Sequence, residues 1–441
     1  MTSRRWAIGF VCSAVAALAA GPVRAQTDST YTRIALSFVR HMEAGAFDTA
    51  AAMISRAVPA GTLDEPRLRQ VWAQLGTAAG TLRSLAPLRT VPQDTLQIVE
   101  LSARFERQSF TIRVVLMPDR TVGGLWFLPA AAPAPPPYAD TTAFLEVDVT
   151  VGAEPWPLAG TLSLPKVDSA PLPAVVLVHG SGPHDRDESI GPNKPFRDIA
   201  WGLASRGIAV LRYDKRTWAH AGRMPRTLSV QDEVQDDAIA AAQLLRAHPR
   251  IDSTRVFVAG HSLGGMMAPR VAASSSAVAG IILLAAPARP LQQVVRDQVR
   301  YLESLTETDA QTRSILRAVL DSLDLLQGRK LAPESLVMGA PASYYYDLDD
   351  YEPVRTARRL ERPILVLHAM RDYQVTESDL NAWISGLQGR DNATVLEYGA
   401  LNHLFMEGRG RAVPSEYAIA GHVADTVIRD IADWVLQRRS R

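Results

Sequence analysis

The chain has 441 residues, of which 47% are hydrophobic and 21% are charged, a balance that is ordinary for globular proteins. Its length suits two or three domains, and its formal net charge of +1 gives no indication of a nucleic acid or an anionic membrane as a partner. The single cysteine, Cys12, lies in the N-terminal apolar run described next, so the mature chain is expected to have no disulfide, cysteine nucleophile or cysteine-based zinc site.

Residues 1–25 have the pattern of a secretory signal peptide. Arg4 and Arg5 form a basic start, residues 6–20 are an apolar run, and Val23-Arg24-Ala25 offers small residues at the cleavage positions. The run is short for a transmembrane span, although an uncleaved N-terminal anchor is the alternative. We therefore expect an exported protein, periplasmic or secreted, with no membrane span once the signal is removed.

Residues 27–129 are predicted to form a small α+β domain. Helical periodicity covers residues 31–44, 47–54 and 65–75, and a period of two covers residues 96–105, 109–116 and 122–128. No combination of catalytic side chains is apparent in this part. The stretch 130–140 that follows begins with eight residues of only alanine and proline, which predicts an extended linker and a domain boundary.

Residues 141–441 have the pattern of one α/β domain. Two strands, at 144–151 and 158–164, are expected to form an antiparallel hairpin at a sheet edge. The apolar runs that follow are typical of strands buried on both faces, and they lie at 173–178, 208–212, 255–259, 280–285, 363–367 and 393–397. Helices are expected between them and at the end of the chain, at 196–206, 230–247 and 417–436. This alternation predicts a doubly wound, mostly parallel sheet.

Between residues 287 and 353 the alternation is interrupted. Two amphipathic helices, at 291–305 and 310–326, are followed by Tyr344-Tyr345-Tyr346. An insertion just past the C-terminal end of a strand lies over the usual ligand site of such a sheet, so we expect it to form a cap. The three tyrosines are predicted to line one wall of a substrate pocket, and the alternative is that they only pack the cap onto the sheet.

The segment Gly260-His261-Ser262-Leu263-Gly264 has the G-x-S-x-G pattern, with an apolar strand before it and a small-residue helix after it. In that context the serine occupies a tight strand-to-helix turn that exposes its hydroxyl at the end of the sheet. The alternative is a glycine-containing turn with an incidental serine. We interpret Ser262 as the nucleophile.

A serine nucleophile needs a base, and the base needs a carboxylate to orient it. His403 lies in a loop after the last predicted strand, and Asp372 lies just past the strand at 363–367. The carboxylates of Asp347, Asp349 and Asp350 fall in the predicted cap and are interpreted as surface charge. The chain order Ser262, Asp372, His403 is that of α/β-hydrolases, and we predict that these three residues are catalytic.

An oxyanion hole requires two backbone N–H groups that point at the developing negative charge. Leu263, directly after the nucleophile, is expected to supply one, and Ser181 or else Gly182, in the turn after the strand at 173–178, the other. The following His184-Asp185-Arg186-Asp187 has an alternative interpretation as a metal cluster. Because a serine, a base and oxyanion donors suffice for the chemistry, we expect neither a metal nor another cofactor.

These motifs resemble those of a known family. Val178-His179-Gly180-Ser181-Gly182-Pro183 with Asp185-Arg186-Asp187, then Arg212-Tyr213-Asp214-Lys215-Arg216, Gly260 to Gly265, and Arg371-Asp372-Tyr373-Gln374-Val375 are similar in order and spacing to motifs of the α/β-hydrolase superfamily, specifically bacterial carboxylesterases. Thr217-Trp218 stand where that family often has glycine, which affects the expected loop shape. Residues 27–129 resemble, in position, size and the pairs Phe47-Asp48 and Gly124-Leu125, the small domain of unknown function that precedes some bacterial hydrolases.

The resemblance implies a serine hydrolase that cleaves small carboxylic esters through an acyl-enzyme intermediate. A thioesterase, an acyltransferase or a peptidase would use the same three residues, and a binding module that keeps the Ser262 turn as a relic is the alternative outside enzymes. The expected partner is a small-molecule ester. The sequence does not indicate the acyl or alcohol group, the role of the N-terminal domain or the oligomeric state.

Overall fold

The computed structural model describes residues 29–438, apart from residues 60, 94, 107–108, 130–133, 168–170, 226 and 306–309. The predicted signal peptide and part of the predicted linker lie outside the described residues. The chain divides into two compact units between Ala134 and Pro135, inside the stretch predicted as a linker. Of the helices that the structure describes, none is long and apolar enough to cross a membrane.

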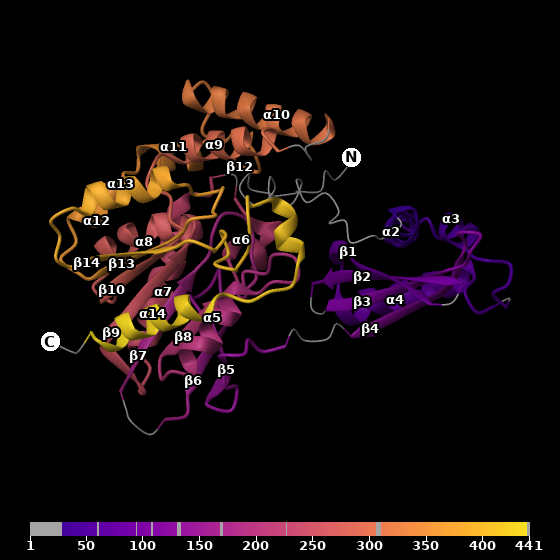
Figure 1. The fold of residues 1–441 in the computed structure, drawn as a ribbon, viewed down its shortest axis with the longest axis horizontal. Helices are drawn as coiled ribbons and strands as arrows, with labels where there is room; N and C mark the ends of the chain where they lie inside the picture. The colour runs from indigo at the N-terminus through magenta and orange to yellow at the C-terminus, as the bar shows by residue number, and fades with distance from the viewer. Residues whose placement is uncertain are drawn as a thin grey trace. The chain divides into compact units, whose positions relative to one another are not determined.

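The N-terminal unit is an antiparallel sheet with helices packed on it (Figure 1). Its described strands lie in chain order, β1 (Leu82–Gln93), β2 (Leu96–Phe105), β3 (Ser109–Leu116) and β4 (Val122–Pro129). The helices are α2 (Ser29–Glu43), α3 (Phe47–Ala52) and α4 (Glu65–Ala79). Phe38, Met42 and Leu68 from the helices pack with Leu101 and Ile112 from the sheet in one apolar core.

Strand β1 is the element of this unit that the sequence does not predict. Among the described strands it pairs with β2 alone, at the edge of the sheet, and its pairing is irregular near Pro87. Most of its side chains are exposed, and Pro87 and Pro92 interrupt the apolar alternation that marks a buried strand. Proline is tolerated at such an edge because the missing N–H faces no partner strand.

The second unit is built on a mostly parallel sheet, which confirms the predicted fold class (Figure 1). Within the described part of the chain the strand order is β14-β13-β10-β9-β7-β8-β6-β5. The pairs β5–β6 and β6–β8 are antiparallel, and the other pairs are parallel. The strand bounds are β5 (Phe144–Val151), β6 (Leu158–Pro165), β7 (Leu172–Val178), β8 (Ala209–Tyr213), β9 (Ile251–His261), β10 (Gly280–Leu284), β13 (Ile364–Ala369) and β14 (Ala393–Tyr398).

Helices cover both faces of this sheet. Side chains of α5 (Pro195–Ala204) and α14 (Asp425–Leu436) pack with Val175 and Leu177 of β7 in one apolar core. Side chains of α7 (Asp236–Arg246) and α8 (Leu263–Ser274) pack with the alternate residues of β7 in another. Because successive residues of a strand point to opposite faces, β7 must be apolar at every position.

Some of the remaining helices match predicted ones and others do not. A π-helical turn (Gln231–Gln235) leads into α7, and together they cover most of the helix predicted at 230–247. Helix α13 (Glu377–Leu387), which follows β13, was not predicted. The short helices α6 (Arg216–Ala219) and α12 (Pro353–Arg358) were not predicted. The prediction of a closing helix from residue 417 is wrong in its first part, because a 3₁₀ turn (Pro414–Ala418) and a helix-free stretch come before α14.

The insertion expected as a cap contains α9 (Leu291–Glu303), α10 (Ala310–Gln327) and α11 (Ala342–Asp350), with a two-stranded ladder of β11 (Leu336–Val337) and β12 (Ala340–Pro341) between α10 and α11. In Figure 1 the three helices lie together, in orange, at one end of this unit. Helices α9 and α10 have the predicted extents to within a few residues. Helix α11, which carries the three consecutive tyrosines, was not predicted as a helix.

Candidate active site

Ser262 occupies a strained turn between β9 and α8, the elbow formed by residues 260–264. Its backbone has φ 50° and ψ −119°, a conformation that residues other than glycine rarely adopt. The flanking glycines make the turn possible. A Cβ on Gly260 would lie 2.1 Å from the carbonyl oxygen of Gly264, and a Cβ on Gly264 would lie 2.2 Å from the carbonyl oxygen of Val178. The backbones of β9, α8 and β7 therefore approach one another more closely than any other residue type allows.

Asp372 and His403 meet at the same end of the sheet. Asp372 follows β13 and His403 follows β14, and Oδ2 of the aspartate lies 2.6 Å from Nδ1 of the histidine. The other carboxylate oxygen accepts the backbone N–H groups of Gln374 at 2.7 Å and Val375 at 3.1 Å. Both side chains are buried. With Nδ1 directed at the carboxylate, Nε2 is the ring atom that can accept a proton.

The elbow and the histidine loop contact each other directly. The rings of His261 and His403 have centroids 4.6 Å apart, and Nε2 of His261 lies 2.9 Å from the backbone oxygen of His403. His261 immediately precedes Ser262 in the chain. The structure therefore brings the predicted base beside the turn that carries the predicted nucleophile.

The predicted oxyanion turn also lies against Ser262. A Cβ on Gly180 would be 3.3 Å from the Cβ of Ser262, and Gly182 has φ +92°, a value that favours glycine. Leu263 is the first residue of α8, and the first N–H groups of a helix have no partner within it. The N–H groups predicted as oxyanion donors thus come from two elements that converge on the serine.

Buried charged residues lie around this turn, and the sequence interpretation gave none of them a role. The carboxylate of Glu188 accepts the Gly180 N–H at 2.6 Å, and its second oxygen faces Nδ1 of His261 at 2.9 Å without meeting the geometry of a hydrogen bond. On the other side, Nζ of Lys215 donates to the Gly180 carbonyl at 2.8 Å. Nζ also lies 3.4 Å from the carboxylate of Glu233.

Glu188 and His261 behave as an ion pair. Burial alone would raise the pKa of the Glu188 carboxyl, but the charge of His261 and contact with it outweigh burial and lower this pKa to about 2. Burial alone would lower the pKa of His261, yet the neighbouring Glu188 carboxylate raises it above its ordinary value. A buried charge is tolerated when its partner is this close.

The residues of the alternative metal reading have other partners. Asp185 accepts the backbone N–H and the hydroxyl of Ser189, each at 2.9 Å. Asp187 pairs with Lys194 at 2.7 Å and also contacts Arg212. Nε2 of His184 lies 2.8 Å from the backbone oxygen of Ser181. Over the residues described, no group of three or more His, Cys, Asp or Glu side chains is arranged to hold a metal ion.

Of the three cap tyrosines, Tyr344 and Tyr345 are buried and Tyr346 is half-buried. Tyr344 is fully buried and donates its hydroxyl to Glu233 at 2.6 Å. Tyr345 is also buried, and its hydroxyl lies 3.3 Å from the carbonyl of Met338. The Tyr346 hydroxyl lies 3.2 Å from the carbonyl of Leu331. These contacts favour the packing alternative, above all for Tyr344, and a pocket-lining role for the tyrosines stays a prediction.

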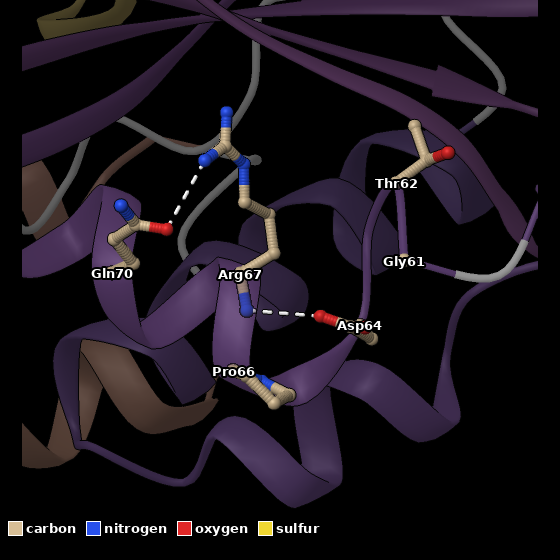
Figure 2. A pocket seen from close by; sticks show the side chains of 6 residues that line it. All are labelled: Gly61, Thr62, Asp64, Pro66, Arg67 and Gln70. Carbon is tan, nitrogen blue, oxygen red and sulfur yellow. Dashed lines mark hydrogen bonds between the residues drawn. The ribbon is translucent and has the colours of Figure 1, made fainter.

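The N-terminal unit has a surface hollow, shown in Figure 2. Asp64 accepts the N–H of Arg67 at 3.0 Å and so caps α4, and the Arg67 guanidinium donates to Gln70 at 3.1 Å. Gly61, Thr62 and Pro66 complete the lining. The side chains around it include no nucleophile with a base beside it, so the hollow is not the candidate active site.

Comparisons with known proteins support the same fold. Residues 175–416 match a family described as the alpha/beta hydrolase family, and residues 35–125 match one described as a protein of unknown function (DUF3887). The chain is 41% identical over 405 residues to Esterase EstD of Thermotoga maritima, and the match covers 91% of this chain and 95% of the esterase.

The solved structures that match this chain are more distant in sequence. Est1E from Butyrivibrio proteoclasticus is 14% identical, with a TM-score of 0.44, and the match covers 66% of this chain and 98% of Est1E. A puromycin hydrolase is 17% identical, with a TM-score of 0.48, and the match covers 81% of this chain and 47% of that chain.

Replacing Gly264 by alanine tests the close approach at the elbow. The new Cβ would lie 2.2 Å from a backbone oxygen of β7, which cannot move without disturbing the sheet. We expect Gly264→Ala to lower the free energy of unfolding by about 3 kcal/mol or more, measured by urea denaturation. The control is Gly222→Ala, where the Cβ meets nothing within 4 Å. Equal unfolding midpoints for the two variants would contradict the argument.

Proposed function

This chain belongs to the alpha/beta hydrolase family and is a carboxylesterase-type hydrolase, and on that premise we propose that it cleaves esters through an acyl-enzyme on Ser262. His403 acts as the base and Asp372 orients it. The observation that carries the proposal is the 2.6 Å contact between Asp372 and His403, held beside a serine in a strained elbow. A serine hydroxyl requires such a base near neutral pH.

In the first half of the reaction, Oγ of Ser262 attacks the ester carbonyl carbon. The hydroxyl proton passes to Nε2 of His403, and the carbonyl electron pair moves onto the oxygen, where the N–H groups of Leu263 and of Ser181 or Gly182 stabilise it. When the tetrahedral intermediate collapses, the bond to the alcohol oxygen breaks. The departing alkoxide takes the proton from His403 and leaves as the alcohol.

The second half repeats these steps with water as the nucleophile. His403 removes a proton from water as the oxygen bonds to the acyl carbon, and the collapse of the second intermediate returns the proton to Oγ of Ser262. Throughout, the Asp372 carboxylate stabilises the imidazolium. The charge changes are met by side chains and backbone dipoles of this chain, so the proposed steps need no metal.

An ester is the substrate class that the comparisons favour. The relative that aligns with nearly the whole chain is described as an esterase, and acyl transfer to water is the simplest use of the proposed three residues. A thioesterase, an acyltransferase or a peptidase would use the same residues, and activity on p-nitrophenyl esters against the matching thioesters and anilides separates these possibilities.

Replacing Ser262 by alanine should abolish turnover without unfolding the protein. The reaction loses its nucleophile, so we expect p-nitrophenyl ester hydrolysis to fall by about 10⁴-fold or more and labelling by a fluorophosphonate probe to disappear. Thermal unfolding serves as the control for folding. A Ser262→Ala enzyme with a tenth of the wild-type activity would mean that the nucleophile is another residue.

Replacing Asp372 by asparagine should lower kcat by about 10³- to 10⁴-fold with little change in KM, because the amide favours the wrong tautomer of His403. The matched control is Asp347→Asn in the cap, where the carboxylate pairs with Arg270 at 2.9 Å near the surface. The control should keep kcat within about threefold. The reverse ranking would place the catalytic acid in the cap.

The selectivity for acyl chain length tests the role of the cap tyrosines. If Tyr345 lines the acyl pocket, short chains of roughly two to six carbons should be preferred, and Tyr345→Ala should move the optimum to longer chains. Each added methylene contributes only ~0.8 kcal/mol, so the profile should be graded. Leu326→Ala, a buried position of α10, controls for a loosened cap. A Tyr345→Ala profile equal to wild type would assign this tyrosine to packing alone.

A further inference from the structure

The peptide groups on either side of Gly180 are held by buried side chains of opposite charge. Glu188 accepts the Gly180 N–H at 2.6 Å, and the Lys215 ammonium donates to the Gly180 carbonyl at 2.8 Å. Glu188 is 1% exposed and Lys215 is 2% exposed. Burying a lysine is costly, so an ammonium placed on a backbone carbonyl beside the nucleophile calls for a reason other than folding.

The geometry of the peptide bond supplies that reason. In a planar trans peptide, the carbonyl of one residue and the N–H of the next point in opposite directions. The Gly180 carbonyl and the Ser181 N–H belong to the same peptide group, so the bond from Lys215 fixes the direction of the Ser181 N–H. A cation on the carbonyl oxygen also polarises the group and makes its N–H a stronger donor.

A buried network holds Lys215 in place. Its ammonium lies 3.4 Å from Oε1 of Glu233, and the same oxygen accepts the Thr217 hydroxyl at 2.7 Å. The second oxygen of Glu233 accepts the Tyr344 hydroxyl at 2.6 Å. Glu233, Thr217 and Tyr344 are all buried. The chain of contacts therefore runs from helix α11 of the cap to the turn beside Ser262.

We propose that Lys215 is a positioning residue that sets the oxyanion hole by orienting and polarising the Gly180–Ser181 peptide. Lys215 acts on the reaction through this peptide and does not touch the substrate. Glu233 fixes the ammonium, and Tyr344 couples the cap to the same carboxylate. The inference rests on the proposed function, because it assigns the Ser181 N–H to the oxyanion.

The test compares turnover with the binding of a transition-state analogue. A trifluoromethyl ketone adds the Ser262 oxygen to its carbonyl carbon and leaves an oxyanion in the hole, so its inhibition constant reports oxyanion stabilisation. We expect Lys215→Met to lower kcat by about 10- to 100-fold with KM within about threefold, and to raise the inhibition constant by the same factor as kcat falls.

Two further variants guard against a trivial loss of structure. Lys215→Met with Glu233→Gln removes both charges together, so no unpaired charge stays buried, and it should show the same two changes. Arg216→Met is the matched control, because Arg216 is the next residue and also forms a buried ion pair. Its partner is Asp237 in α7, and not the peptide groups of Gly180. It should change kcat and the inhibition constant by less than about threefold.

The outcomes separate this inference from the proposed function. If Ser262→Ala is inactive but the double variant keeps kcat and the inhibition constant within about threefold of wild type, the role of Lys215 is overturned while the proposed function stands. A rise in KM alone, or an equal loss in Arg216→Met, also overturns it. If Ser262→Ala stays active, the proposed function itself has failed.

Discussion

The hydrolase unit depends on the close approach of three backbone segments around Ser262. The end of β9, the start of α8 and the end of β7 meet so tightly that Gly260 and Gly264 have no room for a Cβ. This approach forces the serine into a positive φ. The parallel order β14-β13-β10-β9-β7-β8 then places the loops after β7, β13 and β14 at the same end of the sheet as the serine.

Three buried contacts between polar or charged side chains lie at this end of the sheet. The ion pairs Glu188–His261 and Lys215–Glu233 and the hydrogen bond between Asp372 and His403 are all buried and lie close to the Gly180 turn or to the elbow. A buried ion pair often contributes little net stability, because its attraction only offsets the loss of hydration. Pairs of this kind are better explained by the orientation they impose. Here each pair contacts a backbone group or side chain that the proposed mechanism uses.

The sequence predicted the residues of the site that are marked by local context. The glycines around Ser262 mark the elbow, and Asp372 and His403 are predicted as acid and base because each lies just past a strand and parallel strands share one functional edge. The family resemblance and the fold class are confirmed. Local pattern and chain order were therefore sufficient to predict the fold and the family, and the roles of the three site residues stay predictions.

What the sequence did not predict depends on contacts between distant segments. Glu233 contacts Tyr344, which lies 111 positions away in the chain, and no periodicity relates the two. Glu188 resembles any charged loop residue until its partner His261 is known. Strand β1 was missed because an edge strand with Pro87 and Pro92 has the composition of a loop. In each case contacts between distant segments, and not local sequence preference, determine the structure that forms.

Buried contacts fix the insertion to the rest of the hydrolase unit. Val295, Val299 and Leu302 of α9 are buried in the same apolar core as α7 and α8, and the carboxylate of Asp379 holds the backbone N–H groups of Ala288 and Arg289 where the insertion begins. Swinging α9 away as a rigid lid would expose those three side chains, at about 1.5–3 kcal/mol each. An opening that costs this much is rarely populated, so the insertion behaves as a fixed part of the hydrolase unit.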